Sequence, residues 1–176
     1  MAAEARHQTP MPTLPTCTLS PHHAAAADAT ARLQTLLGDR LLSVVLFGSV
    51  ARSRQRDDSD VDLLVVVQGP LPRLAKRWDA LAAALEPAEL ALRTSRPYAC
   101  LSPVVRSPEE VRRGNPLYYD MTQPDERAIL FDRDGFMAGW LQTVADKMRH
   151  YGSRRLFANG AWYWDLAPGH GADIDL

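Results

Sequence analysis

Hydrophobic residues fall into two patterns along the chain: short dense runs, and longer stretches where they recur every three or four positions. Dense runs predict strands and helical spacing predicts amphipathic helices. Leu41–Phe47 and Val61–Val67 are the densest runs, and their β-branched residues favour buried strands. Asp62 is the only polar residue in the second run. Two weaker runs, Tyr98–Val105 and Arg127–Phe131, complete four predicted strands.

Four other stretches carry helix signals. Ser20 followed by Pro21 is typical of a helix N-terminus, and this helix is predicted to end at Gly38. An apolar stripe predicts a second helix over Arg73–Leu85. A capping serine, a proline and two acidic residues predict a third helix that begins at Ser107. A further stripe predicts a fourth helix from Phe136 to His150.

The two ends of the chain differ in character. Residues 1–20 are rich in proline and threonine without periodicity, so they predict a flexible arm. Asn159-Gly160 between two apolar segments predicts a C-terminal β-hairpin. A length of 176 residues suits one domain. We therefore expect a main domain over residues 21–135, with the helix and hairpin of residues 136–176 packed on the same domain.

The composition excludes several classes of protein. Twenty Lys and Arg against twenty-one Asp and Glu exclude a strongly basic nucleic-acid binder, so no DNA partner is expected. No apolar run approaches the roughly 20 residues of a membrane span, and the first residues lack the apolar segment of a secretory signal. Cys17 and Cys100 are too few for a disulfide framework or a four-cysteine zinc site. They indicate reduced thiols in a cytoplasmic protein. The adjacent pair His22-His23 is interpreted as solvated side chains at a helix start.

A phosphate-binding turn is predicted where the first dense run ends. Gly48 has no Cβ, so its backbone can approach a ligand closely. Ser49 begins a predicted helix, where free N–H groups and the helix dipole favour an anion. The serine hydroxyl adds one more donor, and the combination suits a phosphate group.

A metal-binding pair is predicted at the start of the second dense run. Asp60 and Asp62 are separated by one residue, so the period of a strand places both carboxylates on one face. Two adjacent carboxylates repel each other unless a cation lies between them. Hard oxygen ligands favour Mg²⁺, whose remaining ligands are waters and substrate phosphates. Together with the phosphate-binding turn, this pair is typical of phosphoryl or nucleotidyl transfer.

Gly48-Ser49, a gap of ten residues and then Asp60-Val61-Asp62 resemble the signature of the minimal nucleotidyltransferases (MNT) of the DNA polymerase β superfamily. Val50-Ala51-Arg52 and Ser59 also fit that pattern. The resemblance implies an α+β fold, in which a small mixed β-sheet is flanked by helices. It implies a nucleotide site at Gly48, Ser49, Arg52 and Ser59, and a catalytic metal site at Asp60 and Asp62.

The activity implied by the resemblance is transfer of a nucleoside monophosphate, above all AMP, from ATP or another nucleoside triphosphate, with release of pyrophosphate. The acceptor would be a hydroxyl of a partner protein or of tRNA. Many members of this family act as the antitoxin of a HEPN-domain toxin, which would make such a toxin the partner. An antibiotic-modifying transferase ranks last, because its relatives tend to need extra sequence for an acceptor pocket.

Two departures from the family pattern matter. Ser53 stands where the family usually has glycine, a modest change if the backbone there keeps a negative φ. Active relatives usually add a third carboxylate on a later strand, but Tyr98–Val105 contains no acid. The alternative is therefore a catalytically degenerate module that binds a nucleotide or a partner without chemistry.

Overall fold

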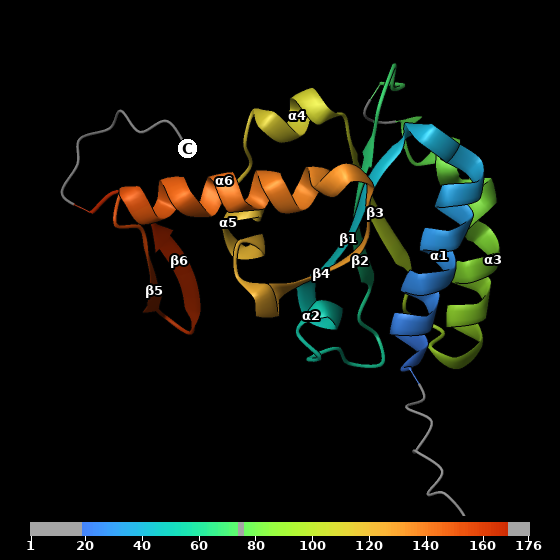
Figure 1. The fold of residues 1–176 in the computed structure, drawn as a ribbon. Helices are drawn as coiled ribbons and strands as arrows, with labels where there is room; N and C mark the ends of the chain where they lie inside the picture. The colour runs from blue at the N-terminus through green and yellow to red at the C-terminus, as the bar shows by residue number, and fades with distance from the viewer. Residues whose placement is uncertain (1–18, 74–75, 169–176) are drawn as a thin grey trace, which may run out of the picture.

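The computed structural model describes residues 19–73 and 76–168 (Figure 1). The helices and strands in chain order are α1 (Pro21–Leu37), β1 (Leu41–Phe47), α2 (Gly48–Ala51), β2 (Val61–Val67), α3 (Asp79–Ser95), β3 (Leu101–Arg106), α4 (Pro108–Arg112), α5 (Leu117–Met121), β4 (Arg127–Asp132), α6 (Phe136–His150), β5 (Arg154–Ala158) and β6 (Ala161–Asp165). Short 3-10 turns lie at η1 (Gly38–Arg40), η3 (Pro124–Glu126) and η4 (Arg133–Gly135).

Four strands form one mixed sheet in the order β3-β2-β1-β4. Strand β1 runs antiparallel to β2 and β4, whereas β2 and β3 run parallel. The two densest apolar runs are therefore the central strands, which explains why nearly all of their residues are buried. A mixed sheet flanked by helices, with a separate β5-β6 hairpin, confirms the predicted α+β fold.

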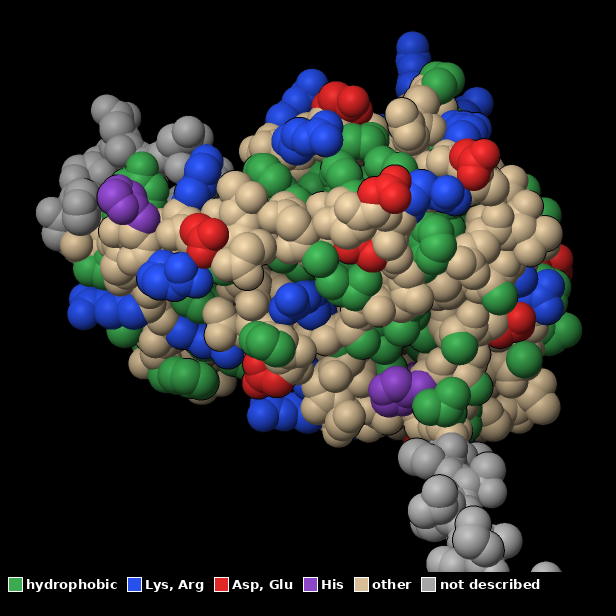
Figure 2. Space-filling model, in the orientation of Figure 1, with side chains coloured by type: hydrophobic (Ala, Val, Ile, Leu, Met, Phe, Trp, Pro, Cys, Tyr) green, Lys and Arg blue, Asp and Glu red, His purple; other side chains and the backbone are tan. Residues whose placement is uncertain are grey.

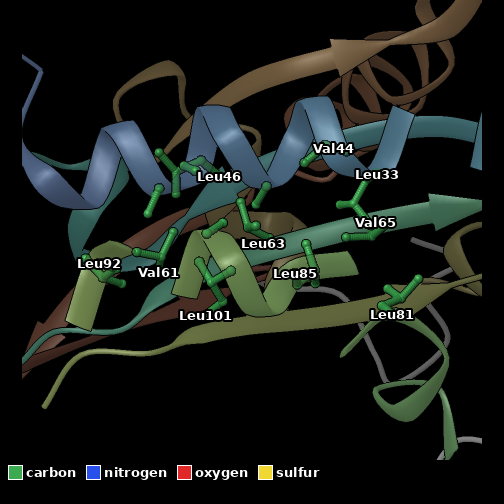
Figure 3. Close-up of a cluster of buried hydrophobic side chains, with 14 of the residues drawn as sticks. Leu33, Val44, Leu46, Val61, Leu63, Val65, Leu81, Leu85, Leu92 and Leu101 are labelled. Carbon is green, nitrogen blue, oxygen red and sulfur yellow. The ribbon is translucent and has the colours of Figure 1, made fainter. Parts of the chain in front are cut away.

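The sheet has a hydrophobic cluster on each face, because alternate strand residues point to opposite sides. Leu63 of β2 points to the face covered by α1 and α3, where it packs with Leu33 and Leu85 (Figures 1 and 3). Leu64 points to the opposite face, where α5 and α6 contribute Tyr118 and other buried residues. Burial on both faces holds the ends of β1 and β2 in place, and the candidate site residues are attached to those ends.

The helix predicted over Arg73–Leu85 was wrong in its bounds, since α3 begins later and continues to Ser95. Trp78 precedes the helix and is 38% exposed instead of lying in the core. The helix passes through Pro87, although proline removes a backbone hydrogen bond from a helix interior. Ala88 and Leu92 beyond it are buried in the cluster that α1 shares, so burial of this longer apolar face outweighs the lost bond.

The remaining elements follow the sequence with a few differences. His22 is only 2% exposed and is buried near the 56–59 loop and α3. The interpretation of His22-His23 as two solvated side chains was therefore wrong for His22. The short helix α5 was not predicted. Most of the predicted arm and Leu74 of the predicted stripe lie outside the described residues.

The hairpin follows α6 and lies on the side of the molecule away from α1 and α3 (Figure 1). Asn159 and Gly160 have φ of 53° and 78°, the positive values that a type I′ turn requires at both central positions. Among the helices of residues 19–73 and 76–168, none has the length and apolar character needed to cross a bilayer.

Candidate active site

The candidate residues gather at one end of the sheet. Phe47, the last residue of β1, lies opposite Asp62 of β2, so the turn into α2 begins beside this carboxylate. Gly48 and Ser49 are the first two residues of α2. Strand pairing thus brings together the two motifs that are separated by ten residues in the sequence.

Gly48 makes the closest approach within the site. Its φ is +73°, a backbone conformation that costs a residue with a side chain about 1–2 kcal/mol. A Cβ at this position would lie 2.2 Å from Oδ2 of Asp62. The carboxylate of Asp62 therefore lies directly over the backbone of Gly48, and both the conformation and the space require glycine.

Asp60 lies in the loop just before β2 and is exposed. Its Oδ1 accepts hydrogen bonds from the backbone N–H and from Sγ of Cys100, both at 3.1 Å. Burial and the Asp60 carboxylate raise the pKa of the Cys100 thiol to about 12, so the thiol stays protonated and can donate. Cys100 thus fixes one oxygen of Asp60 in place.

Asp62 is half-buried, and this raises its pKa above the ordinary value for aspartate. The nearby charge of Asp60 raises the pKa further, whereas the charge of Arg52 and a hydrogen bond from Ser102 lower it. Keeping Asp62 ionised in this position therefore lowers the stability of the folded protein. A bound cation would remove this cost by lying against both carboxylates.

The donor set fits Mg²⁺ only in part. Asp60 and Asp62 offer hard carboxylate oxygens, and Asp62 lies in a cradle that a Cβ on Gly48 would fill. Within residues 19–73 and 76–168, no group of three or more His, Cys, Asp or Glu side chains is arranged to hold a metal. A magnesium ion on this pair would therefore take its other ligands from nucleotide phosphates and water.

Strand β3 places a neutral hydroxyl beside the pair. It runs parallel to β2, and Ser102 lies directly opposite Asp62. Cross-strand partners share one face of the sheet, and the Ser102 hydroxyl hydrogen-bonds Asp62. An acidic side chain at position 102 would lie beside Asp62, whereas this chain has a neutral hydroxyl there.

Arg52 and Ser59 have partners of their own. The Nη1 atom of Arg52 donates to Oε2 of Glu126 at 2.9 Å, and the charge of Arg52 reaches Asp62. The Oγ atom of Ser59 accepts from the backbone N–H of Arg56 at 2.9 Å, which closes the loop before Asp60. Sequence reasoning missed Glu126, because no local pattern marks it.

Serine in place of the usual glycine at position 53 would be a modest change only with a negative φ. Ser53 instead adopts a φ of +54°, so the backbone there is strained. We expect Ser53→Gly to raise the free energy of unfolding by about 0.5–1 kcal/mol, because relief of the left-handed strain exceeds the entropy that glycine loses on folding. Thermal unfolding should show a Tm higher by about 1–4 °C. Ser53→Ala keeps a Cβ and should give no such rise; an equal rise in both variants would contradict the strain.

A sequence model of the family described as nucleotidyltransferase domain matches residues 30–121, more than half of the chain. The matched region contains both motifs of the candidate site. A protein from Methanocaldococcus jannaschii that is named as a protein adenylyltransferase is 31% identical over 133 residues. The match covers 74% of this chain and 84% of that protein.

Solved structures of toxin–antitoxin complexes are also similar to this chain. A chain in a crystal structure of a toxin–antitoxin with AMP-PNP is 17% identical, with a TM-score of 0.44 over 70% of this chain and 87% of that chain. A chain in a structure of a tri-AMPylated Shewanella oneidensis HEPN toxin with an MNT antitoxin is 17% identical, with a TM-score of 0.40 over 74% and 92%. The family assignment rests on the two sequence matches.

Proposed function

This chain belongs to the nucleotidyltransferase domain family, and we propose that it transfers AMP from ATP to a macromolecular hydroxyl with release of pyrophosphate. The observation that carries the proposal is the approach of Asp62 to the backbone of Gly48, where no Cβ would fit. This contact joins a carboxylate pair suited to Mg²⁺ with a turn suited to phosphate. Adenylate as the transferred group is supported by the name of the 31% identical relative.

Each site residue has a proposed role in this reaction. Asp60 and Asp62 would hold Mg²⁺, which neutralises charge on the phosphates and on the departing pyrophosphate. Gly48 and the Ser49 hydroxyl would bind the β- and γ-phosphates, and Ser59 would border the nucleotide. Arg52 would offset charge on the triphosphate. The acceptor hydroxyl would then attack the α-phosphorus in line, its proton would pass to water, and the bond between the α-phosphorus and the bridging oxygen would break as pyrophosphate leaves.

The proposed acceptor is a protein hydroxyl. The name of the relative supports this choice, and the resemblance to minimal nucleotidyltransferases makes a HEPN-domain toxin the first candidate partner. A tRNA acceptor is the second candidate, since basic side chains gather around the hairpin and the C-terminal end of α6 (Figure 2). Arg149 and Arg154 in that region already pair with Asp146 and Asp165, which weakens the case for RNA.

The proposal extends to the organisation and location of the protein. Residues 21–135 would form the nucleotidyltransferase domain, with the helix and hairpin of the predicted 136–176 segment packed on it; residues 169–176 of that segment lie outside the described residues. The ion pair between Arg155 of β5 and Glu126 supports this packing. A cytoplasmic location is supported by the free thiol of Cys100.

Label transfer tests the proposal. Purified wild type and Asp60→Ala would be incubated with Mg²⁺ and each α-³²P-labelled nucleoside triphosphate, with cell-extract protein and total tRNA as acceptors. We expect label from ATP to move to a protein band with wild type and not with Asp60→Ala. Asp58→Asn is the matched control, because Asp58 is an exposed carboxylate in the same loop that pairs with Arg56. Label that moves equally well with Asp60→Ala would contradict the proposed site.

The second candidate function is nucleotide or partner binding without chemistry, and Ser102 is the observation that favours it. Absence of transfer together with Mg²⁺-dependent ATP binding would establish this function. Ser102→Asp distinguishes the two, because it adds a carboxylate opposite Asp62.

We expect Ser102→Asp to raise the transfer rate by about 10- to 100-fold, since the added carboxylate can take the proton of the attacking hydroxyl. Initial rates with saturating ATP would measure the change. Ser102→Asn, which has a similar size but no charge, should give no gain. A gain with Asn would mean that the added volume, and not the charge, changed the rate.

A further inference from the structure

A buried carboxylate joins the motif helix to the C-terminal hairpin. Glu126 at the end of η3 is only 5% exposed. One of its oxygens accepts from Arg52 at 2.9 Å, and the other accepts from Nη2 of Arg155 in β5. Burial alone would raise the pKa of Glu126, but the hydrogen bonds from Arg155 and Arg52 outweigh it, so the pKa is lowered. Glu126 is therefore ionised at neutral pH and holds both guanidinium groups.

An aromatic side chain of the hairpin faces the same two arginines. The ring centroid of Trp162 lies 4.5 Å from Cζ of Arg155 and 5.6 Å from Cζ of Arg52. These distances are typical of cation–π contacts. The indole Nε1 of Trp162 donates to Oδ1 of Asp120 at 3.1 Å, and Trp164 donates to the same oxygen at 2.9 Å. Asp120 thus fixes the ring against the arginines.

These contacts reach the candidate active site through Arg52. Arg52 immediately follows α2, the helix whose first residue lies under the carboxylate of Asp62. Within residues 19–73 and 76–168, Glu126 is the only carboxylate that forms an ion pair with Arg52. Arginine has many rotamers, so its direction depends on the groups that hold it. Here those groups come from η3 and the hairpin.

We propose that the C-terminal hairpin is part of the nucleotide site, because Trp162 and Glu126 are positioning residues that orient Arg52 toward the triphosphate. This inference rests on the proposed function, in which Arg52 offsets phosphate charge. Glu126 accepts a hydrogen bond from Nη1 of Arg52. The other N–H groups of the Arg52 guanidinium can donate to phosphate oxygens. A side chain oriented before the ligand arrives binds it at a lower entropic cost.

A double-mutant cycle on MgATP binding tests the inference. Isothermal titration calorimetry would give the Kd of the full chain as wild type, Trp162→Leu, Arg52→Ala and the double variant. We expect each single substitution to weaken binding by about 10-fold, the range for loss of one hydrogen bond to a charged group. If Trp162 acts through Arg52, the double variant should bind no more weakly than Arg52→Ala alone. A purely structural tryptophan would not give this result.

Two further variants separate positioning from damage to the hairpin. Trp162→Phe keeps an aromatic face for Arg52 and should stay within about 3-fold of wild type. Arg154→Gln breaks the Arg154–Asp165 ion pair on the other face of the hairpin and should leave the Kd unchanged. If Trp162→Leu does not fold, Glu126→Gln replaces it in the same cycle, with the same expected outcome.

The outcomes distinguish this inference from the proposed function. A wild type that binds no MgATP overturns both. Suppose instead that the wild type binds MgATP and that Trp162→Leu weakens binding by the same factor with and without Arg52. This result overturns the positioning role alone. Unchanged binding in Arg52→Ala also overturns it.

Discussion

Asp62→Asn is expected to lower the rate of nucleotidyl transfer by at least about 1000-fold while the protein stays folded. The proposed metal takes one of its two protein carboxylates from this residue, and metal stabilisation of charge in the transition state is worth several kcal/mol. Single-turnover transfer with labelled ATP and Mg²⁺ would measure the loss. Asp58→Asn, an exposed substitution four residues away, should retain the wild-type rate.

The same substitution should raise stability in the absence of divalent cations. Burial and the charge of Asp60 raise the pKa of Asp62 in the folded protein. A carboxyl whose pKa is raised on folding makes the protein less stable as pH rises through the interval between the unfolded and folded pKa values. At pH 7 with EDTA, we therefore expect a higher Tm for Asp62→Asn than for wild type. The difference should shrink as pH falls below the ordinary pKa of aspartate.

Stability and activity together identify what Asp62 does. If the residue were only structural, its replacement would lower the Tm as well as any activity. A lower Tm at pH 7, or transfer within about 10-fold of wild type, would contradict the metal-binding role. We expect activity to be lost while stability is retained or increased. This pattern is typical of a functional side chain that lowers the stability of the folded protein.

Gly48→Ala is expected to reduce both stability and transfer. The new Cβ would lie 2.2 Å from Oδ2 of Asp62, and the backbone φ of +73° already disfavours any side chain. Left-handed strain costs about 1–2 kcal/mol and overpacking about 1–3 kcal/mol, so we expect a loss of about 2–5 kcal/mol in the free energy of unfolding. Because Asp62 must move, transfer should fall by about 100-fold or more. Urea unfolding and label transfer would measure the two effects.

Gly135→Ala is the matched control for the backbone strain. Gly135 has a φ of +67°, but a Cβ there would meet no atom within 4 Å. In this variant, the free energy of unfolding should fall only by the cost of the left-handed backbone. The rate of transfer should be unchanged. If Gly48→Ala were no more destabilising than Gly135→Ala, the close approach of Asp62 to the backbone would be wrong.

The sequence by itself determined the central strands and the placing of both motifs at the ends of those strands. Dense β-branched runs predict buried strands because few other environments accept them, and β1 and β2 begin and end as expected. Gly48-Ser49 directly after a strand is a local pattern set by residue type, and so is an aspartate pair where another strand begins. The period of two applies only to Asp62, because Asp60 lies in the loop before β2. The helix that follows Ser107 was also predictable from local sequence, because its capping box involves two residues three positions apart.

Only the tertiary structure decided what surrounds those motifs. Ser102 faces Asp62 because β3 joins the sheet parallel to β2, and no spacing in the sequence specifies that register. Glu126 reaches Arg52 across 74 positions, and Trp162 approaches the same arginine from the hairpin. The length of α3 likewise followed from burial against α1, which outweighed the proline inside it. Such contacts depend on how distant segments pack, so residue patterns within one segment do not determine them.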